Sequence, residues 1–231
     1  MSELLRYEDR DGVALVTMDD GKVNALSPTM LEAFGAALDR AEREAKALVI
    51  VGRPGRFSAG FDLKTMMSGV GPAKALIRLG AETLMRLYLS PLPTVAACTG
   101  HALAGGALLL LACDTRVGTA GEFQVGLNEV AISMPLPLFA QGLARDRLAK
   151  RHLIAATLQA KRYAPSEALE VGYLDALEAA GSVVDRAEAE ARALAQLSRQ
   201  AYGLTKKGLR EATATHVRST LAADLERIVP S

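Results

Sequence analysis

Short hydrophobic runs alternate with amphipathic stretches along the first half of the chain. Residues Val13–Met18, Ala47–Gly52 and Thr94–Cys98 form runs of the kind that build strands. The second run is continuously apolar, as expected of a strand that is covered on both faces. Apolar side chains recur at helical spacing over 30–41, directly after the N-terminal helix signal Ser27-Pro28. The pattern therefore predicts strands that alternate with helices.

The second half of the chain is predicted to be mostly helical. After a helix over 73–88, another from about 107 and a strand near 115–118, helices are expected over 138–142, 144–157, 166–170 and 184–201. Alternating strands and helices indicate an α/β protein with a late helical part. Because no linker rich in Gly, Ser or Pro divides the chain, we expect one core over 1–190 and a helical C-terminal region over 191–231.

Composition and charge exclude several classes of protein. Of 231 residues, 50% are hydrophobic, and 27 Lys and Arg oppose 26 Asp and Glu, which gives a net charge of +1. This balance argues against disorder and against a nucleic-acid binder. The most apolar stretch, Ala102–Cys113, is too short to span a bilayer, and the N-terminus lacks a secretory signal. Because the chain has only two cysteines, we expect a cytoplasmic protein. The charge balance and the short apolar stretch lead us to expect that it binds neither nucleic acid nor a membrane.

Two glycine-containing loops, each between an apolar run and a helix, are the first candidates for a functional site. They span Arg56–Lys64 and Gly100–Ala107. A helix N-terminus leaves backbone N–H groups unpaired, so two such loops side by side could direct two donors at one developing oxyanion. Alternatively, both loops are only tight strand-to-helix turns. The three histidines lack the spacing of metal ligands, so no metal is expected.

Short motifs in one order resemble the crotonase (enoyl-CoA hydratase/isomerase) superfamily from about Val13 to about Lys207. These motifs are Asn24–Ser27, Phe57–Leu63, Pro93–Ala97, Gly100–Gly106, Cys113-Asp114, Gly126–Val130, Ala164–Ala168 and Val171–Asp175. The resemblance implies a spiral of ββα units and C-terminal helices that pack in a homotrimer or hexamer. It also implies an acyl-CoA thioester substrate, with no cofactor beyond the coenzyme A that the substrate carries.

The same resemblance assigns roles to individual residues. The backbone N–H groups of Phe61 and Gly105 would form the oxyanion hole. The side chain of Asp62 would hold its loop by hydrogen bonding to the backbone. The remaining substrate-binding positions implied by the resemblance are Ala25, Ala59, Lys64 and Leu108. Lys64 would lie near a CoA phosphate, although a solvated lysine at the start of a helix fits this position equally well.

The carboxylates decide the reaction. Family hydratases use two glutamates, which hold a water between them. The first falls three residues after the oxyanion glycine, where this chain has Leu108, and the second corresponds to Glu129 in Gly126-Leu127-Asn128-Glu129. A single carboxylate suffices to move a proton from C2 to C4 of a 3-enoyl-CoA. The chain therefore resembles the single-glutamate enoyl-CoA isomerase branch, with Glu129 as the general base.

Two other interpretations remain open at this stage: a hydratase with its second acid elsewhere, and a non-catalytic acyl-CoA binding protein. The C-terminal region also departs from the family, whose members usually continue through another helical stretch after the equivalent of Lys207. Such a stretch can close the CoA pocket of a neighbouring subunit, so we expect a region shorter than usual. Lys206 or Lys207 could still meet phosphate.

Overall fold

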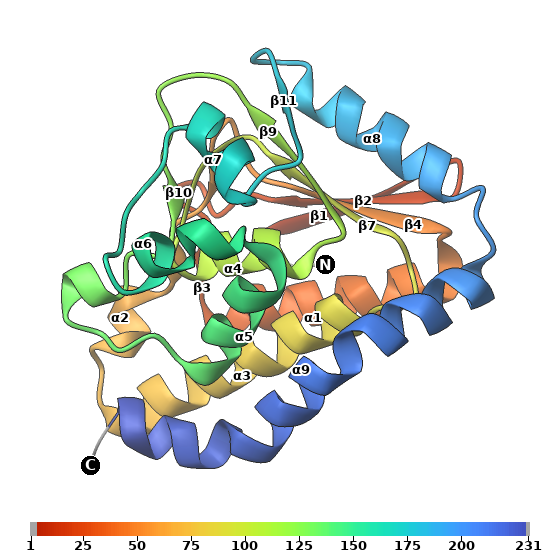
Figure 1. Ribbon diagram of the computed structural model, residues 1–231. Helices are drawn as coiled ribbons and strands as arrows, with labels where there is room; N and C mark the ends of the chain where they lie inside the picture. The colour runs from red at the N-terminus through yellow and green to blue at the C-terminus, as the bar shows by residue number, and fades with distance from the viewer. Residues whose placement is uncertain (1–3, 230–231) are drawn as a thin grey trace.

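The computed structural model describes residues 4–229 and contains a six-stranded sheet (Figure 1). Its strand order is β1-β2-β4-β7-β9-β11, with only the β1–β2 pair antiparallel. The strands are β1 (Leu5–Arg10), β2 (Val13–Met18), β4 (Ala47–Val51), β7 (Thr94–Cys98), β9 (Thr115–Thr119) and β11 (Ala176–Glu178). The strands expected at 13–18, 47–52, 94–98 and 115–118 are confirmed.

Shorter strands lie beyond the ends of the main sheet. Parts of the two glycine-containing segments, Arg56–Lys64 and Gly100–Ala107, form some of these strands. One small sheet has the order β10-β8-β5, and the two-stranded one pairs β3 with β6. The strands are β3 (Ala25–Leu26), β5 (Gly55–Ser58), β6 (Gly60–Phe61), β8 (Gly100–Leu103) and β10 (Val125–Gly126). Along the chain, β7 and β9 are each followed by one short strand and then a helix, and β4 is followed by two short strands and then a helix, so the ββα repeat is present.

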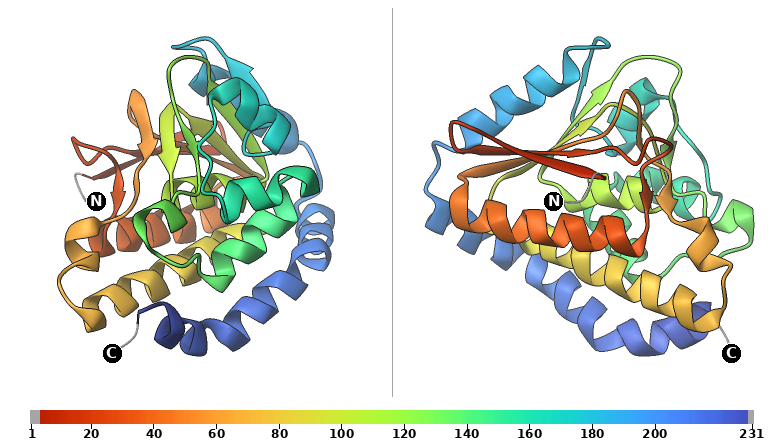
Figure 2. Two further views of the ribbon diagram at one scale, coloured as in Figure 1. Left: turned by 60° about the vertical axis from the view of Figure 1, so that its left-hand side comes forward. Right: turned by 180° about the vertical axis from the view of Figure 1, so that it is seen from behind.

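Helices cover both faces of the main sheet (Figures 1 and 2). Helix α8 (Val183–Leu194) lies across one face, where Ala187 and Ala191 pack with Val49 and Val95 in a separate hydrophobic cluster. The opposite face is covered by α1 (Pro28–Glu44), α3 (Val70–Leu89) and α4 (Gly105–Ala112), while α9 (Arg199–Ile228) packs outside them against α3 and α5 (Leu138–Arg147). The apolar spacing over 30–41 accordingly faces the core, since Met30, Leu31, Phe34, Ala37, Leu38 and Ala41 are buried.

Tertiary contacts move several helix boundaries. The helix expected over 144–157 is wrong, because α5 (Leu138–Arg147) and α6 (Leu153–Thr157) are separate. Leu148 between them is extended, and the Ala149 N–H donates to the Val171 carbonyl, a long-range bond that no helix propensity reveals. The remaining α-helices of the described residues are α2 (Leu63–Met66) and α7 (Pro165–Val171), and two short 3-10 helices span Val130–Ile132 and Lys150–His152.

The helix expected over 184–201 is also two helices. Helix α8 ends at Leu194, and α9 begins after Ser198, whose Oγ accepts a hydrogen bond from the Ala201 N–H. The chain therefore turns over 195–198, whereas residue 190, the expected end of the core, lies inside α8. Residues 208–228 continue α9 without interruption. Assignment of 191–231 to trimer contacts stays a prediction.

The first half of α9 is fixed to the core by a buried ionic cluster. The Asp114 carboxylate accepts from Lys206 Nζ at 2.7 Å, and it lies 2.8 Å from Arg210 Nη1. Burial alone would raise the pKa of Asp114, but these two cations hold it below its usual value. Asp114 is thus a structural partner, as expected. The suggestion that Lys206 meets phosphate is wrong, because this side chain is buried and also donates to the Leu92 carbonyl.

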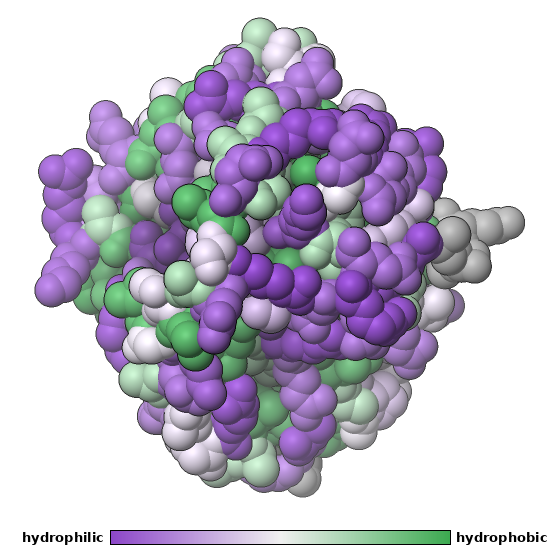
Figure 3. All heavy atoms as spheres, turned by 90° about the vertical axis from the view of Figure 1, so that its right-hand side faces the viewer, coloured by the Kyte–Doolittle hydropathy of each residue, from purple (hydrophilic) through white to green (hydrophobic). Residues whose placement is uncertain are grey.

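On the side of α8 and the start of α9, hydrophilic side chains dominate and hydrophobic patches are scattered (Figure 3). Within residues 4–229, no helix combines the length and the apolar character that crossing a membrane requires.

Candidate active site

The amides of Phe61 and Gly105 meet where β6 lies against the start of α4. A Cβ placed on Gly105 would stand 3.3 Å from the Phe61 nitrogen, and one placed on Gly60 would stand 2.8 Å from the Gly105 nitrogen. Gly105 is the first residue of α4, a position whose N–H has no partner within the helix. The structure thus brings the two predicted oxyanion-hole amides together.

The entrance to α4 is strained. Ala104 adopts φ 50° and ψ −123°, a conformation that costs a residue with a side chain about 1–3 kcal/mol. Its N–H donates to the Gly126 carbonyl, and its carbonyl accepts from the Leu108 N–H. In the same turn, a Cβ on Gly106 would stand 2.2 Å from the Ser58 carbonyl oxygen. Strain and small residues together allow α4 to approach the loop that carries Phe61 so closely.

Glu129 is the candidate base, and it lies buried just after β10. Only 8% of its surface is exposed, and its Oε2 atom makes no hydrogen bond. Burial raises the pKa of Glu129 to about 7. The carboxylate borders a small cavity of 30 Å³. Its described walls are Phe61, Ile77, Leu108, Glu129, Met134, Pro135, Pro137, Phe139, Ile228 and Val229, among which only Glu129 is ionisable.

Leu108 lies in the wall of the same cavity. It follows Gly105 by three residues in α4, and 1% of its surface is exposed. This is the position at which the two-glutamate pattern would put the other carboxylate. Since no other described wall residue carries one, the lining of the cavity contains a single acid–base group beside apolar side chains.

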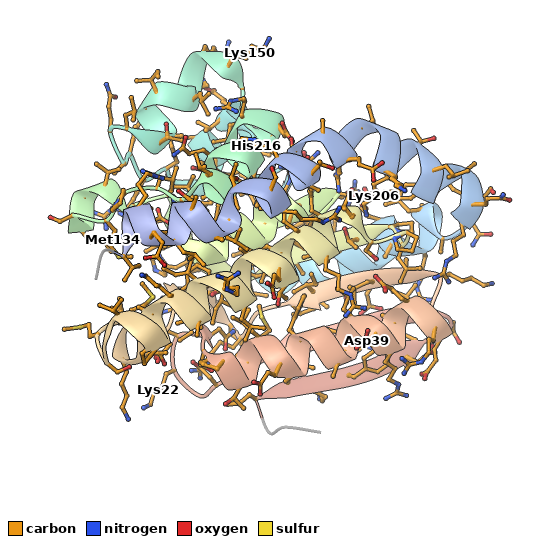
Figure 4. All side chains as sticks on the ribbon, turned by 90° about the horizontal axis from the view of Figure 1, so that it is seen from below. Lys22, Asp39, Met134, Lys150, Lys206 and His216 are labelled. Atoms are coloured by element: carbon orange, nitrogen blue, oxygen red, sulfur yellow. The ribbon has the colours of Figure 1, made fainter. Side chains whose placement is uncertain are left out.

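The end of α9 forms a further wall, which the sequence analysis missed. Ile228 and Val229 border the cavity, and Met134 lies beside the end of this helix (Figure 4). The position is fixed by Asp224, whose Oδ2 accepts from the Leu138 N–H at 2.7 Å and whose Oδ1 pairs with Arg227. The only sequence signal was an apolar pair at the end of a polar helix.

The remaining predicted substrate residues lie outside this cavity. Ala25 pairs with Gly60 between β3 and β6, while Ala59 is exposed and its N–H donates to the Val23 carbonyl. Lys64 is exposed on the short helix α2, so its amine is open to solvent. Their roles stay predictions.

Two further residues of the loops have structural partners. The carboxylate of Asp62 caps α2 by accepting from the Thr65 N–H at 2.8 Å, as expected. His101 Nδ1 accepts from the Gln124 N–H at 3.1 Å, so this imidazole is engaged with the backbone. Over residues 4–229, no cluster of three His, Cys, Asp or Glu side chains is arranged to hold a metal ion.

Comparison with known proteins defines the class. Residues 8–228 match the family model of enoyl-CoA hydratase/isomerase, and the chain belongs to this family. The chain is 31% identical over 233 residues to enoyl-CoA delta isomerase 1, mitochondrial, of Rattus norvegicus, a match that covers 96% of this chain and 79% of the relative. It is 34% identical over 216 residues to a putative enoyl-CoA hydratase of Thermus thermophilus, covering 86% and 81%.

A solved structure agrees over nearly the whole chain. The apo structure of an enoyl-CoA isomerase from Mycobacterium tuberculosis matches with a TM-score of 0.92 at 42% identity, covering 97% of this chain and 100% of that one. These findings confirm the crotonase-type fold expected from the sequence motifs. An acyl-CoA thioester substrate is consistent with membership of this family.

Proposed function

We propose that this enzyme converts 3-enoyl-CoA thioesters to 2-enoyl-CoA thioesters, with Glu129 as the only acid–base group. One observation carries the proposal: among the described residues that line the cavity, Glu129 alone is ionisable. A family relative of which the match covers 79%, enoyl-CoA delta isomerase 1 of Rattus norvegicus, is named for this class of reaction.

The proposed reaction moves one proton and shifts one double bond. The Glu129 carboxylate takes a proton from C2, so that an enolate forms and its negative charge develops on the thioester oxygen. The amides of Phe61 and Gly105 donate to that oxygen. The same carboxyl group then returns the proton to C4, and the double bond ends between C2 and C3. A pKa of about 7 suits a group that must both accept and return a proton near neutral pH.

Hydration is the less favoured reaction for this site. Addition of water across a double bond needs one group to activate the water and another to protonate the adjacent carbon. Leu108 can neither donate nor accept a proton, and the other described wall residues are apolar. A family relative from Thermus thermophilus bears the name putative enoyl-CoA hydratase, so the experiment includes that reaction.

The test incubates the purified protein separately with a 3-enoyl-CoA and with a 2-enoyl-CoA while the absorbance of the conjugated thioester is followed. Formation of conjugated product from the first supports the proposal. Loss of the conjugated-thioester absorbance from the 2-enoyl-CoA would instead identify a hydratase. Binding without either reaction would identify a non-catalytic acyl-CoA protein.

Variants tie the activity to Glu129. We expect Glu129→Gln to lower kcat by at least about a hundredfold, the typical worth of a general base. Glu122→Gln, which changes an exposed glutamate, is the matched control and should retain the wild-type rate. Full activity of Glu129→Gln would refute the mechanism.

We further propose that the protein is a homotrimer or hexamer, on the basis of the family resemblance alone, and that it is cytoplasmic, on the basis of its two cysteines. Light scattering of the purified chain tests the assembly, because a monomeric mass would contradict it. Microscopy of a tagged chain in its native cell tests the compartment.

A further inference from the structure

The cavity beside Glu129 is much smaller than an acyl chain. Its volume of 30 Å³ has room for only a few atoms and is far below the 420 Å³ of the larger hollow behind its wall. A substrate that places C2, C3 and C4 next to the carboxylate must therefore lead its remaining carbons elsewhere. Ile77, Leu108 and Phe139 close the cavity on the side of the core, since all three are buried almost completely.

A second, larger hollow lies directly behind the cavity wall, and we call it the distal groove. It has a volume of 420 Å³, and its lining consists of Val130, Pro135, Leu136, Gln141, Arg145, Leu153, Ile154, Thr157, Leu158 and Arg227. Pro135 borders both spaces. In addition, Val130 follows Glu129 in the chain, and Arg227 precedes Ile228, so neighbouring residues face the two spaces.

The distal groove presents apolar side chains to solvent. Val130, Ile154 and Leu158 are 41%, 56% and 66% exposed, although side chains of this size are usually buried. The two cations of the lining do not make it a polar site, because Arg227 pairs with Asp224 and Arg145 is exposed at the rim. A hydrocarbon chain fits this lining better than a charged or hydrogen-bonding group.

We propose that the distal groove binds the far end of the acyl chain, and that the substrates are 3-enoyl-CoA thioesters with long aliphatic chains. This inference rests on the proposed isomerase function and specifies its substrate. The chain would pass Pro135, the shared wall residue. Each methylene buried there should raise kcat/KM by about fourfold, the equivalent of its transfer from water.

The experiment compares 3-hexenoyl-, 3-octenoyl- and 3-dodecenoyl-CoA as substrates. For the wild type, kcat/KM is expected to increase along this series. Leu158→Glu and Ile154→Glu each place a charge in the distal groove, and each should lower the ratio of kcat/KM for the dodecenoyl over the hexenoyl substrate at least tenfold. Leu204→Glu is the matched control, because Leu204 is 65% exposed on α9, does not line the groove, and should leave the ratio unchanged.

A binding measurement separates this inference from the isomerase proposal. Titration calorimetry of saturated dodecanoyl- and hexanoyl-CoA reports the preference for chain length without turnover. If no 3-enoyl-CoA is converted but Leu158→Glu abolishes the preference for binding the longer acyl chain, the isomerase proposal fails. The inference that the distal groove binds the acyl chain then still holds.

Two results would overturn the inference. One is that Leu158→Glu and Ile154→Glu both keep the wild-type preference for the longer acyl chain, in turnover and in binding. The other is that light scattering shows a changed mass of the assembly for Leu158→Glu while the preference for the longer acyl chain stays the same. This result would show that a second copy of the chain covers the distal groove.

Discussion

The ring of Phe61 occupies the space that a side chain at position 80 would need. A Cβ on Gly80 would stand 2.1 Å from Cε1 of Phe61. Helix α3 therefore requires a glycine here so that the loop with the Phe61 amide can lie against it. This close packing links a helix of the core to the candidate oxyanion hole.

Gly80→Ala should consequently impair catalysis. The added methyl group displaces the ring and with it the Phe61 amide, and a misplacement of about 1 Å costs roughly a hundredfold in rate. Steady-state kinetics with a 3-enoyl-CoA would measure the loss in kcat. Gly71→Ala in the same helix is the control, since nothing lies within 4 Å of its added Cβ, and it should retain full activity.

A second prediction concerns Gly60. Its φ of 94° disfavours any side chain, and its added Cβ would stand 2.8 Å from the Gly105 nitrogen. Gly60→Ala should lower kcat by about 10²–10³, as loss of one oxyanion donor does. Gly55→Ala introduces similar backbone strain, with φ 77°, but meets no atom within 4 Å. Equal losses in the two variants would show that backbone strain alone is responsible.

The raised pKa of Glu129 predicts the pH dependence of the rate. The first step needs the carboxylate, so kcat/KM, which reports the free enzyme, should increase with pH and reach half its maximum near pH 7. A profile of kcat/KM measured between pH 5 and 9 with subsaturating substrate tests this. A midpoint near the usual glutamate value would mean that the carboxylate is solvated in the working enzyme.

The same group should make stability depend on pH with a definite sign. Between its unfolded pKa of 4.5 and its folded value of about 7, Glu129 binds more protons in the folded state, so the unfolding free energy falls as pH rises. The total loss is about 3 kcal/mol for such a shift. Urea unfolding at pH 5 and pH 8 should show this decrease in the wild type but a smaller one in Glu129→Gln.

Asp114→Asn tests how α9 is held. The variant leaves Lys206 and Arg210 buried without their shared carboxylate, and breaking a buried ion pair from one side costs about 3–5 kcal/mol. Denaturant unfolding should show this loss. Glu211→Gln serves as control, because its pairing with Lys207 at 3.5 Å is exposed and should contribute less than about 1 kcal/mol.

Sequence reasoning recovered the parts of the fold whose signal is local. The strands β4 and β7 are continuous apolar runs, and α1 has a cap, a proline and a regular apolar face. In contrast, β11 and β10 are two or three residues long and exist only because they pair with β9 and β8. Their side chains carry no pattern that could distinguish them from a loop.

The candidate site divides in the same way. The motifs identified Phe61, Gly105 and Glu129, and the structure brings the first two together and buries the third. The wall formed by Ile228 was not predicted, because its position depends on the path of a helix that begins at Arg199. The wall formed by Met134 was not predicted either, because this residue lies in an irregular segment ahead of α5. An apolar residue at a helix end does not reveal in the sequence which cavity it will close.

Helix α9 joins two distant features, since Asp114 holds it near Lys206 and Ile228 closes the cavity at its other end. The 22 residues between Lys206 and Ile228 span about 33 Å at 1.5 Å per residue. A change of about 2° in the direction of the helix axis at the ionic cluster would therefore move the cavity wall by about 1 Å. The hydrogen bond from the Leu138 N–H to Asp224 holds the far end of α9 against such a shift, so the shape of the space beside Glu129 depends on both ends of this helix.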